Sequence, residues 1–267
     1  MKMDVGEITA MILTFNEEAN IQRTLERLAW AGRVLLIDSG STDSTLEIAA
    51  GFENVDVIQR SFDSFAEQCN FGLGHVTRGW VLSMDADYVL DDGFEDEVRS
   101  LSDGRDISGY ETSFIYAVYG QRLSGTLYPP RTVLYRSGIA RYRDVGHGHR
   151  VEVPGTVKRL ASRIIHDDRK PIERWLGSQR SYVRKEADRI LAIDGGGGWK
   201  DKIRLLAIPS PLLVLGYCLF WKGCILDGRA GLHYALQRCY AELLLSLELL
   251  DRRLSGRPDE KGPNREC

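Results

Sequence analysis

The stretch Val81-Leu82-Ser83-Met84-Asp85-Ala86-Asp87-Tyr88 decides the fold of this chain. An apolar run ends in two carboxylates, and residues two apart point the same way in an extended chain. We predict a buried strand over residues 80–84, with Asp85 and Asp87 at its carboxyl end, where open α/β sheets bind ligands. Two neighbouring carboxylates repel each other, so a divalent ion that carries a phosphate fits between them. The same acids also suit a turn, because Asp91-Asp92-Gly93 follows closely.

The composition is that of an ordinary globular protein. A chain of 267 residues is long enough for one substantial α/β core, and its formal charge of −3 gives no indication of a nucleic-acid partner. The five cysteines form no Cys-x-x-Cys pair, which favours a reducing compartment over a disulfide framework or a zinc site. Residues 1–6 carry acids and the apolar residues 8–15 are too few for a signal peptide. We therefore expect a cytoplasmic location.

Strand and helix patterns alternate through the first half of the chain. We predict strands over residues 8–14, 34–37 and 55–58, and a helix over residues 65–73 before the strand that ends at Asp85. Further helices are expected after Asn16, as an N-cap, and from the loop after Asp38 through Ala50. This order predicts a mostly parallel sheet whose strand ends turn polar side chains toward one crevice. Those side chains are Thr14, Asn16, Asp38, Asp85 and Asp87.

Four motifs in this order resemble the family 2 glycosyltransferases, which have the GT-A nucleotide-binding α/β fold, a mostly parallel sheet flanked by helices. The motifs are Ile12-Leu13-Thr14-Phe15-Asn16-Glu17-Glu18, Ile37-Asp38-Ser39-Gly40-Ser41-Thr42-Asp43, Asn70-Phe71-Gly72-Leu73 and Leu82-Ser83-Met84-Asp85-Ala86-Asp87. They cover roughly the first third of the chain. Within the family, the sequence is similar to the group that includes lipopolysaccharide core glucosyltransferases.

The resemblance implies an inverting transfer of a sugar from a nucleotide donor, usually a UDP-sugar, to an acceptor hydroxyl. It implies that a nucleobase pocket is lined by Thr14, Phe15 and Asn16, with Glu17 beside them, and that Asp38 accepts a hydrogen bond from the base. Asp85 then reaches the ribose or the metal, and Asp87 holds Mg²⁺ or Mn²⁺ against the diphosphate. Independently, the departure of a nucleoside diphosphate develops negative charge, which a metal held by carboxylates stabilises.

One position departs from the family pattern. The residue before Asn70 is usually basic in the family, and here it is Cys69. Asn70 and Gln68 are candidates for contact with the nucleotide, with Gln68 replacing the basic residue against the base or ribose. The alternative for Gln68 is an exposed helix residue without a role.

The catalytic base is expected near residues 141–151. Relatives of the lipopolysaccharide type carry His-Glu before Arg-Val at this place, and that Glu resembles a catalytic base. Here Arg150-Val151 follows Gly148-His149, so His149 stands where the carboxylate would be. Histidine titrates near neutrality and suits the same work. Asp144 is the alternative base, and the further alternatives for His149 are a phosphate or acceptor contact and a structural histidine in a glycine-spaced loop.

We predict strands over residues 109–119 and 131–135. The charged segment 166–170, further along the chain, completes the candidate site. His166 ends another short strand, and the resemblance implies that a histidine here joins Asp87 at the metal, as a mixed N/O pair for Mn²⁺. Arg169 and Lys170 follow and suit neutralisation of the diphosphate. We expect Asp167 and Asp168 to lie in a surface turn.

The sequence pattern of the remaining chain predicts a helical appendage that associates with a membrane. We place the GT-A domain at residues 1–194, a flexible linker at 195–202 around four successive glycines, and a helical hairpin at 203–267. Residues 205–221 carry no charge, contain Pro209 and Pro211, and are flanked by basic residues, which suits a helix lying in the bilayer surface. A second helix is expected over residues 233–254. The alternatives are a soluble hairpin that covers the sheet and a dimer interface.

Together these patterns predict a metal-dependent, inverting glycosyltransferase. It would act at the cytoplasmic face of a membrane, contacting it through residues 203–254, on a lipid-linked glycan or lipopolysaccharide-type acceptor. A polyprenyl-phosphate sugar synthase is an alternative, because an anionic acceptor needs no strong base. A non-catalytic nucleotide-sugar-binding scaffold is the other.

Overall fold

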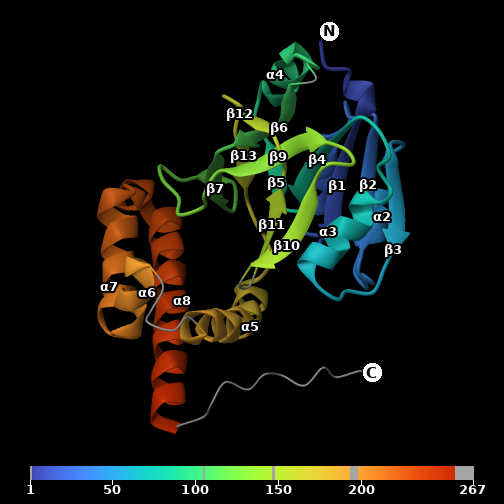
Figure 1. Ribbon diagram of the computed structural model, residues 1–267. Coiled ribbons are helices and arrows are strands. Elements are labelled where there is room, and N and C mark those ends of the chain that lie inside the picture. The colour runs from blue at the N-terminus through green and yellow to red at the C-terminus, as the bar shows by residue number, and fades with distance from the viewer. Residues whose placement is uncertain (1, 105, 146–147, 193–197, 256–267) are drawn as a thin grey trace. The chain divides into compact units, whose positions relative to one another are not determined.

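The computed structural model describes residues 2–104, 106–145, 148–192 and 198–255, and these form two compact units (Figure 1). The first unit spans Met1–Lys170 and the second spans Pro171–Cys267. The boundary therefore falls before the helix Ile172–Leu191, which the sequence analysis had placed in the first domain. This helix packs its buried side chains against the long C-terminal helix, so it belongs to the second unit.

The first unit contains a seven-stranded, mostly parallel sheet in the order β12-β6-β9-β4-β1-β2-β3 (Figure 1). β1 runs parallel to β2 and β4, β2 to β3, and β6 to β12, whereas β9 runs antiparallel to both of its neighbours. The bounds are β1 Ile8–Thr14, β2 Arg33–Asp38, β3 Val55–Gln59, β4 Trp80–Asp85, β6 Ile107–Thr112, β9 Arg131–Arg136 and β12 Thr156–Arg159. The predicted mostly parallel sheet is confirmed.

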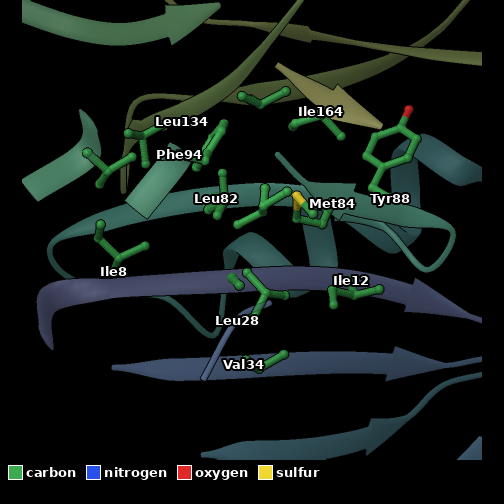
Figure 2. Packing of buried hydrophobic residues seen from close by; sticks show 14 of the residues in the cluster. Ile8, Ile12, Leu28, Val34, Leu82, Met84, Tyr88, Phe94, Leu134 and Ile164 are labelled. Atoms are coloured by element: carbon green, nitrogen blue, oxygen red, sulfur yellow. The ribbon is translucent and has the colours of Figure 1, made fainter. Parts of the chain in front are cut away.

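Alternation along the central strands sends side chains into two separate cores. On β1, Ile8 and Ile12 enter one core, with helices on that side, whereas Met11 enters the other. Figure 2 shows the first core, where Ile12 and Met84 come from neighbouring strands. The period of two in strand side chains explains this division. Both faces of β1 are buried, as expected of a central parallel strand.

Helices cover both faces of the large sheet. Their bounds are α1 Ile21–Glu26, α2 Thr45–Ala49, α3 Phe65–Leu73 and α4 Phe94–Ser100. The predicted helix over residues 65–73 is confirmed as α3. The prediction that Asn16 caps the helix after β1 is wrong, because α1 begins only at Ile21. Asn16 has a positive φ of 55°, and its side-chain oxygen instead accepts a hydrogen bond from the Thr42 amide at 2.8 Å.

Two smaller sheets complete the first unit. The order β5-β13-β7-β8 joins Tyr88–Leu90, Ile164–His166, Phe114–Val118 and Gln121–Arg122, and the hairpin β10-β11 joins Arg141–Val145 to Gly148–Glu152. The single strand predicted over residues 109–119 is wrong. The chain changes sheets at Ser113, whose carbonyl accepts a hydrogen bond from the Ile164 amide, so β6 and β7 pair with different partners.

The second unit is entirely helical within its described residues. It contains α5 Ile172–Leu191, α6 Trp199–Leu205, α7 Pro209–Gly216, the π-helical turn η2 Tyr217–Trp221, the 3-10 turn η3 Cys224–Asp227 and α8 Gly228–Ser255. Residues 199–202 of the predicted flexible linker are helical, and 195–197 lie outside the described residues. Arg204 joins the helices through ion pairs with Glu186 at 3.0 Å and Glu242 at 2.6 Å.

Among the described residues, no single helix is both long and apolar enough to cross a membrane. Pro209–Trp221 and Cys224–Ser255 together meet the length and composition needed, but the pair is bent by 73°.

Candidate active site

The carboxyl ends of β1, β2 and β4 bring the predicted site residues to one edge of the large sheet. Thr14 lies beside Asp38 in the β1–β2 register, and Leu13 lies beside Asp85 in the β1–β4 register. Strand ends that lie side by side in a parallel sheet are where α/β proteins bind ligands. Three polar loops from distant positions in the sequence therefore converge here.

Asp38 organises the loop after β2. Its carboxylate is fully buried and accepts four hydrogen bonds, from the Thr14 hydroxyl at 3.0 Å, the Ser41 hydroxyl at 2.5 Å, and the Gly40 and Ser41 amides at 2.9 Å each. Charged acceptors bound to several amides are held firmly in place. The predicted hydrogen bond from a nucleobase to Asp38 would have to replace or share one of these four.

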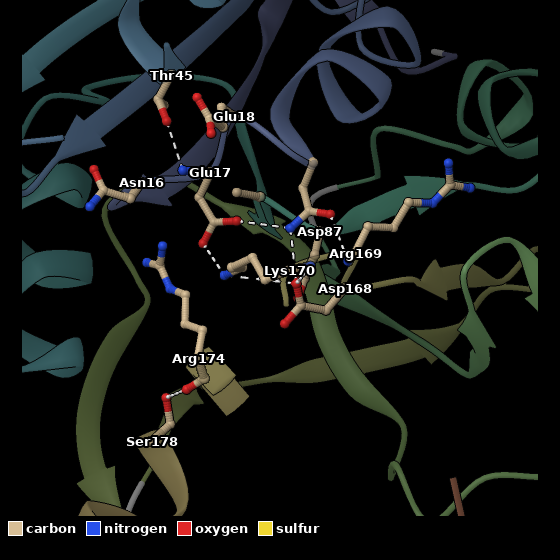
Figure 3. Close-up of polar contacts among 12 residues, drawn as sticks. Asn16, Glu17, Glu18, Thr45, Asp87, Asp168, Arg169, Lys170, Arg174 and Ser178 are labelled. Carbon is tan, nitrogen blue, oxygen red and sulfur yellow. Dashed lines mark hydrogen bonds and ion pairs between the residues drawn. The ribbon is translucent and has the colours of Figure 1, made fainter. Parts of the chain in front are cut away.

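The chain after β1 is fastened to the same loop. The Asn16 amide donates to the Ser41 hydroxyl at 2.9 Å, and the Glu17 amide donates to the Thr45 hydroxyl at 2.7 Å (Figure 3). Phe15, between Thr14 and Asn16, is 49% exposed. An exposed aromatic ring beside a rigid polar loop suits stacking of a flat base.

Gln68 and Asn70 lie on α3 and are both engaged. Gln68 is fully buried, so the alternative of an exposed residue is wrong. Its amide donates to Ser39 at 3.0 Å and accepts from Arg60 at 2.5 Å. Asn70 donates to the Tyr142 carbonyl and accepts from the Tyr142 amide, at 3.0 and 2.8 Å. Asn70 therefore fixes β10 to α3, and Arg60 supplies a cation close to Gln68.

Asp87 and His166 form a largely buried pair just beyond the end of β4. The His166 Nε2 and the Asp87 Oδ2 lie 3.1 Å apart, with side chains 16% and 15% exposed. Burial disfavours the charged form of each side chain, but the attraction between the Asp87 carboxylate and the His166 imidazolium is stronger than this effect. The pKa of Asp87 is therefore lowered, and the pKa of His166 is raised. Asp87 Oδ1 and His166 Nδ1 are buried without a hydrogen-bond partner. Such atoms are costly unless a ligand completes them.

Three tyrosine rings surround His166. Tyr88, Tyr116 and Tyr128 have ring centroids 5.4, 4.9 and 5.0 Å from the imidazole. The hydroxyls of Tyr88 and Tyr128 are hydrogen-bonded to each other. These aromatic rings restrict the orientation of the His166 imidazole. The sequence analysis did not identify these three tyrosines, because they come from three separate segments.

A second cluster of charges lies beside Asp87. Lys170 bonds to Glu17 at 2.5 Å, and Asn20 donates to Glu17 at 3.0 Å and to Asp168 at 3.0 Å (Figure 3). Burial of Glu17, opposed by Lys170, raises the pKa of its carboxyl to about 6. The nearby Asp87 charge adds to this rise.

The expected surface turn over Asp167 and Asp168 is wrong for Asp167, which is buried. Its carboxylate accepts from Arg23 at 2.9 Å and from Arg169 at 2.8 Å. Arg169 is therefore partly neutralised by Asp167, which weakens its case as a free diphosphate contact.

His149 and Asp144 face each other across the β10-β11 hairpin. Asp144 accepts from the Ser64 hydroxyl at 2.7 Å and from the Ala66 amide at 3.2 Å, at the start of α3. A carboxylate at a helix N-terminus is a capping arrangement. The His149 ring packs between Phe65 and Tyr142, with centroids at 5.6 and 5.4 Å. Burial lowers the pKa of His149, so its ring is neutral near pH 7.

Arg131 is a further cation at this edge that the sequence analysis did not select. It opens β9, which runs antiparallel beside β4, and its guanidinium lies 4.6 Å from the Tyr128 ring centroid. A basic residue directly after Pro129-Pro130 at the start of a strand was the available signal.

Within the described ranges, no group of three or more His, Cys, Asp and Glu side chains is placed to hold a metal ion. Asp87 and His166 are the two candidate ligands that lie together, and the Asp85 side chain makes no hydrogen bond or ion pair within the described residues. A Mg²⁺ or Mn²⁺ ion bound here would take its other ligands from phosphate oxygens and water, as Mg²⁺ commonly does.

The family model of glycosyl transferase family 2 matches residues 9–156, which is 148 of the 267 residues. A lipopolysaccharide core biosynthesis glycosyltransferase, LpsC of Rhizobium meliloti (strain 1021), is 28% identical over 88 residues, 32% of this chain and 33% of LpsC. An uncharacterized glycosyltransferase, RT0209 of Rickettsia typhi, is 32% identical over 94 residues, 35% of this chain and 32% of RT0209. The chain thus spans about a third of the length of these relatives.

Two solved structures are similar to the chain at low identity. S. aureus TarS 1-349 in complex with UDP-GlcNAc has a TM-score of 0.46 and 15% identity, over 95% of this chain and 93% of that 1-349 fragment. Glucosyl-3-phosphoglycerate synthase from Mycobacterium tuberculosis, with Mn²⁺, UDP and phosphoglyceric acid, has a TM-score of 0.44 and 15% identity, over 70% of this chain and 78% of the synthase.

Proposed function

Because the chain belongs to glycosyl transferase family 2, we propose that it moves a sugar from a nucleotide-sugar donor to an acceptor hydroxyl. The observation that carries this proposal is the pair Asp87–His166, buried at the sheet edge with one oxygen and one nitrogen that have no partner. The unpartnered Asp87 Oδ1 lies at the same sheet edge as Thr14 and Asp38. This position supports a ligand site rather than a structural ion pair.

The donor is proposed to be a UDP-sugar whose diphosphate lies against a divalent metal. Asp87, with His166 and Asp85 beside it, would hold Mg²⁺ or Mn²⁺, which stabilises the charge of the departing diphosphate. The unpartnered Asp87 Oδ1 fits this role, because it offers a free carboxylate oxygen in a buried place. Phe15 and Asn16 would contact the base, while Asp38 keeps their loop rigid.

The chain's own residues then prepare the acceptor for attack. His149 is neutral near pH 7, and its ring makes no hydrogen bond within the described chain, so a nitrogen is available to accept the acceptor's proton. Attack from the face opposite the leaving diphosphate inverts the anomeric centre. Asp144 remains the alternative base, but two hydrogen bonds from the start of α3 already occupy its carboxylate.

The acceptor is proposed to be a lipid-linked glycan or a lipopolysaccharide-type molecule at the cytoplasmic face of a membrane. Support comes from the second unit, where large apolar side chains are exposed on α7, η2 and η3, including Leu212, Phe220, Trp221 and Leu226 at 66–84%. Lys222 lies next to Trp221 and suits anionic headgroups. A soluble protein rarely exposes so much apolar surface without a partner. LpsC, the relative from Rhizobium meliloti, is itself named for lipopolysaccharide core biosynthesis.

A second candidate is sugar transfer to a polyprenyl phosphate. The observation that favours it is that Asp144, the carboxylate opposite His149, already accepts two hydrogen bonds from the start of α3, and an anionic acceptor needs no carboxylate base. A scaffold that binds nucleotide-sugar without turnover is the third candidate.

Turnover separates these candidates. Release of nucleoside diphosphate would be measured with UDP- and GDP-sugars, Mn²⁺ and a membrane extract, for the wild type, Asp87→Asn and His149→Ala. We expect turnover by the wild type, and a loss of about a hundredfold or more in both variants. Full activity of His149→Ala on a polyprenyl phosphate would favour the second candidate. Nucleotide binding without turnover on any extract would favour the scaffold.

Vesicle flotation tests the membrane contact. The wild type should float with anionic vesicles, and a double variant Phe220→Ser, Trp221→Ser should remain in solution. Phe62→Ser removes an exposed ring from the first unit and serves as the matched control. Equal flotation of the wild type and the double variant, or a dimer that hides this surface, would reject the membrane proposal.

A further inference from the structure

Arg131 stands at the sheet edge where the proposed chemistry takes place. The β4–β9 register pairs Trp80 with Arg136 and Leu82 with Leu134. This antiparallel register brings the start of β9 to the end of β4, the strand that closes with Asp85. Pro129 and Pro130 precede Arg131, and their fixed φ angles restrict the backbone that presents it.

The Arg131 guanidinium has no polar partner in the described chain. It makes neither a hydrogen bond nor an ion pair there, and its one recorded contact is the face of Tyr128, at 4.6 Å. Other partly buried arginines of the first unit are paired: Arg23 bonds to Asp167, and Arg136 bonds to Asp103. A half-buried guanidinium with all five N–H donors unused is therefore exceptional in this unit.

Asp85 and His149 are ionisable neighbours of Arg131 at this sheet edge. Burial opposes the Arg131 charge, but Tyr88, Tyr128 and the Asp85 carboxylate outweigh it, so the pKa of Arg131 is raised. Arg131 and Asp85 nevertheless form no ion pair. His149 is influenced by both of them, so all three groups border one region. Neither Asp85 nor His149 makes a side-chain hydrogen bond within the described residues. The Arg131 guanidinium stacks on the ring of Tyr128 and has no ion pair with Asp85, so its N–H donors can bind an incoming anion.

We propose that Arg131 binds a phosphate group of the substrate, through charge-assisted hydrogen bonds from its guanidinium. The planar fork of Arg matches phosphate oxygens in a way that a lysine does not. The proposal rests on the function proposed above and names a contact that the four sequence motifs do not include. Phosphate reaches this edge from two sources, the diphosphate of the donor or a phosphate carried by the acceptor.

Binding measurements on the full chain distinguish the two sources. UDP and uridine would be titrated in the presence of Mn²⁺, and farnesyl phosphate and farnesol in detergent, against the wild type, Arg131→Met and Arg131→Lys. Arg78→Met is the control, because Arg78 is an exposed cation just before β4, at the opposite end of that strand. Uridine binding reports whether each variant retains the folded pocket.

We expect Arg131→Met to lose about tenfold or more in affinity for one of the phosphate probes, with Arg131→Lys between it and the wild type. A loss confined to UDP assigns Arg131 to the donor, and a loss confined to farnesyl phosphate assigns it to the acceptor. Unchanged affinity for both phosphates, or an equal loss for uridine, would overturn the proposal. If the wild type does not bind UDP, the UDP-sugar donor proposed above fails first, whatever the variants do.

Discussion

Replacing Asp38 by Asn tests whether this carboxylate organises the nucleotide loop. In the wild type its two oxygens accept hydrogen bonds from Thr14, Gly40 and Ser41, four in all, away from water. Asn keeps one acceptor oxygen, so its NH₂ group faces donors in either orientation. Two charge-assisted bonds are lost at ~1.5–3 kcal/mol each, and we take ~3 kcal/mol as the net cost after the hydroxyls reorient.

The rate at which the Cys69 thiol is alkylated measures this loss of stability for the first unit alone. The thiol is buried on α3, and burial also raises its pKa, so an alkylating reagent reaches it only when the unit opens. A cost of ~3 kcal/mol corresponds to labelling on the order of a hundredfold faster, read from the peptide that contains Cys69. Asp56→Asn is the matched control, because Asp56 is an exposed partner of Arg33 and such pairs contribute ~0–1 kcal/mol. Labelling of Asp38→Asn within about threefold of the wild type would refute the reasoning, since its free energy of opening would then be nearly unchanged.

Three other predictions follow from single residues. Gly72→Ala should destabilise the first unit by ~1–3 kcal/mol in a urea titration, because the added Cβ would lie 2.6 Å from the Met11 sulfur; wild-type stability would contradict this packing. The His166 pKa is raised, so the pairing with Asp87 stabilises the fold at low pH and this contribution is lost as the pH rises through the folded pKa; the stability difference between the wild type and His166→Gln should shrink above pH ~6.5, and a constant difference would reject the pairing. Glu17→Gln should gain stability relative to the wild type as the pH rises from 4.5 to about 6, because burial raises the pKa of this acid in the folded state; a relative loss over that range would show that the Lys170 pair dominates instead.

The strands of the first half were predictable because local pattern and tertiary position agree. Residues 8–14 and 80–84 are apolar runs that end in polar loops, and the structure has β1 and β4 there. The local pattern gave a wrong prediction at Asn16. Asparagine is a common N-cap residue, but here it has a positive φ, and its side chain accepts a hydrogen bond from the Thr42 amide. The local pattern failed again at Ser113, where pairing with strands far along the chain divides one apolar run into two.

The site residues divide in the same way. Thr14, Asp38 and Asp85 follow from strand ends, and a parallel sheet necessarily brings such ends together. The burial of Asp167 depends on Arg23, 144 residues away, so no short pattern announces it. Arg131 is similar: the strand over residues 131–135 was predicted, but its antiparallel pairing beside β4, which places Arg131 at the site, was not.

The most direct test of the account is calorimetric titration of UDP into the wild type and Asp87→Asn, each with saturating Mn²⁺ and with EDTA. EDTA should weaken UDP binding to the wild type about tenfold or more, and Asp87→Asn should bind UDP equally weakly in both conditions. Binding by the wild type that is indifferent to EDTA, or an Asp87→Asn variant that still gains affinity from Mn²⁺, would contradict the claim that this buried carboxylate holds a metal against the diphosphate.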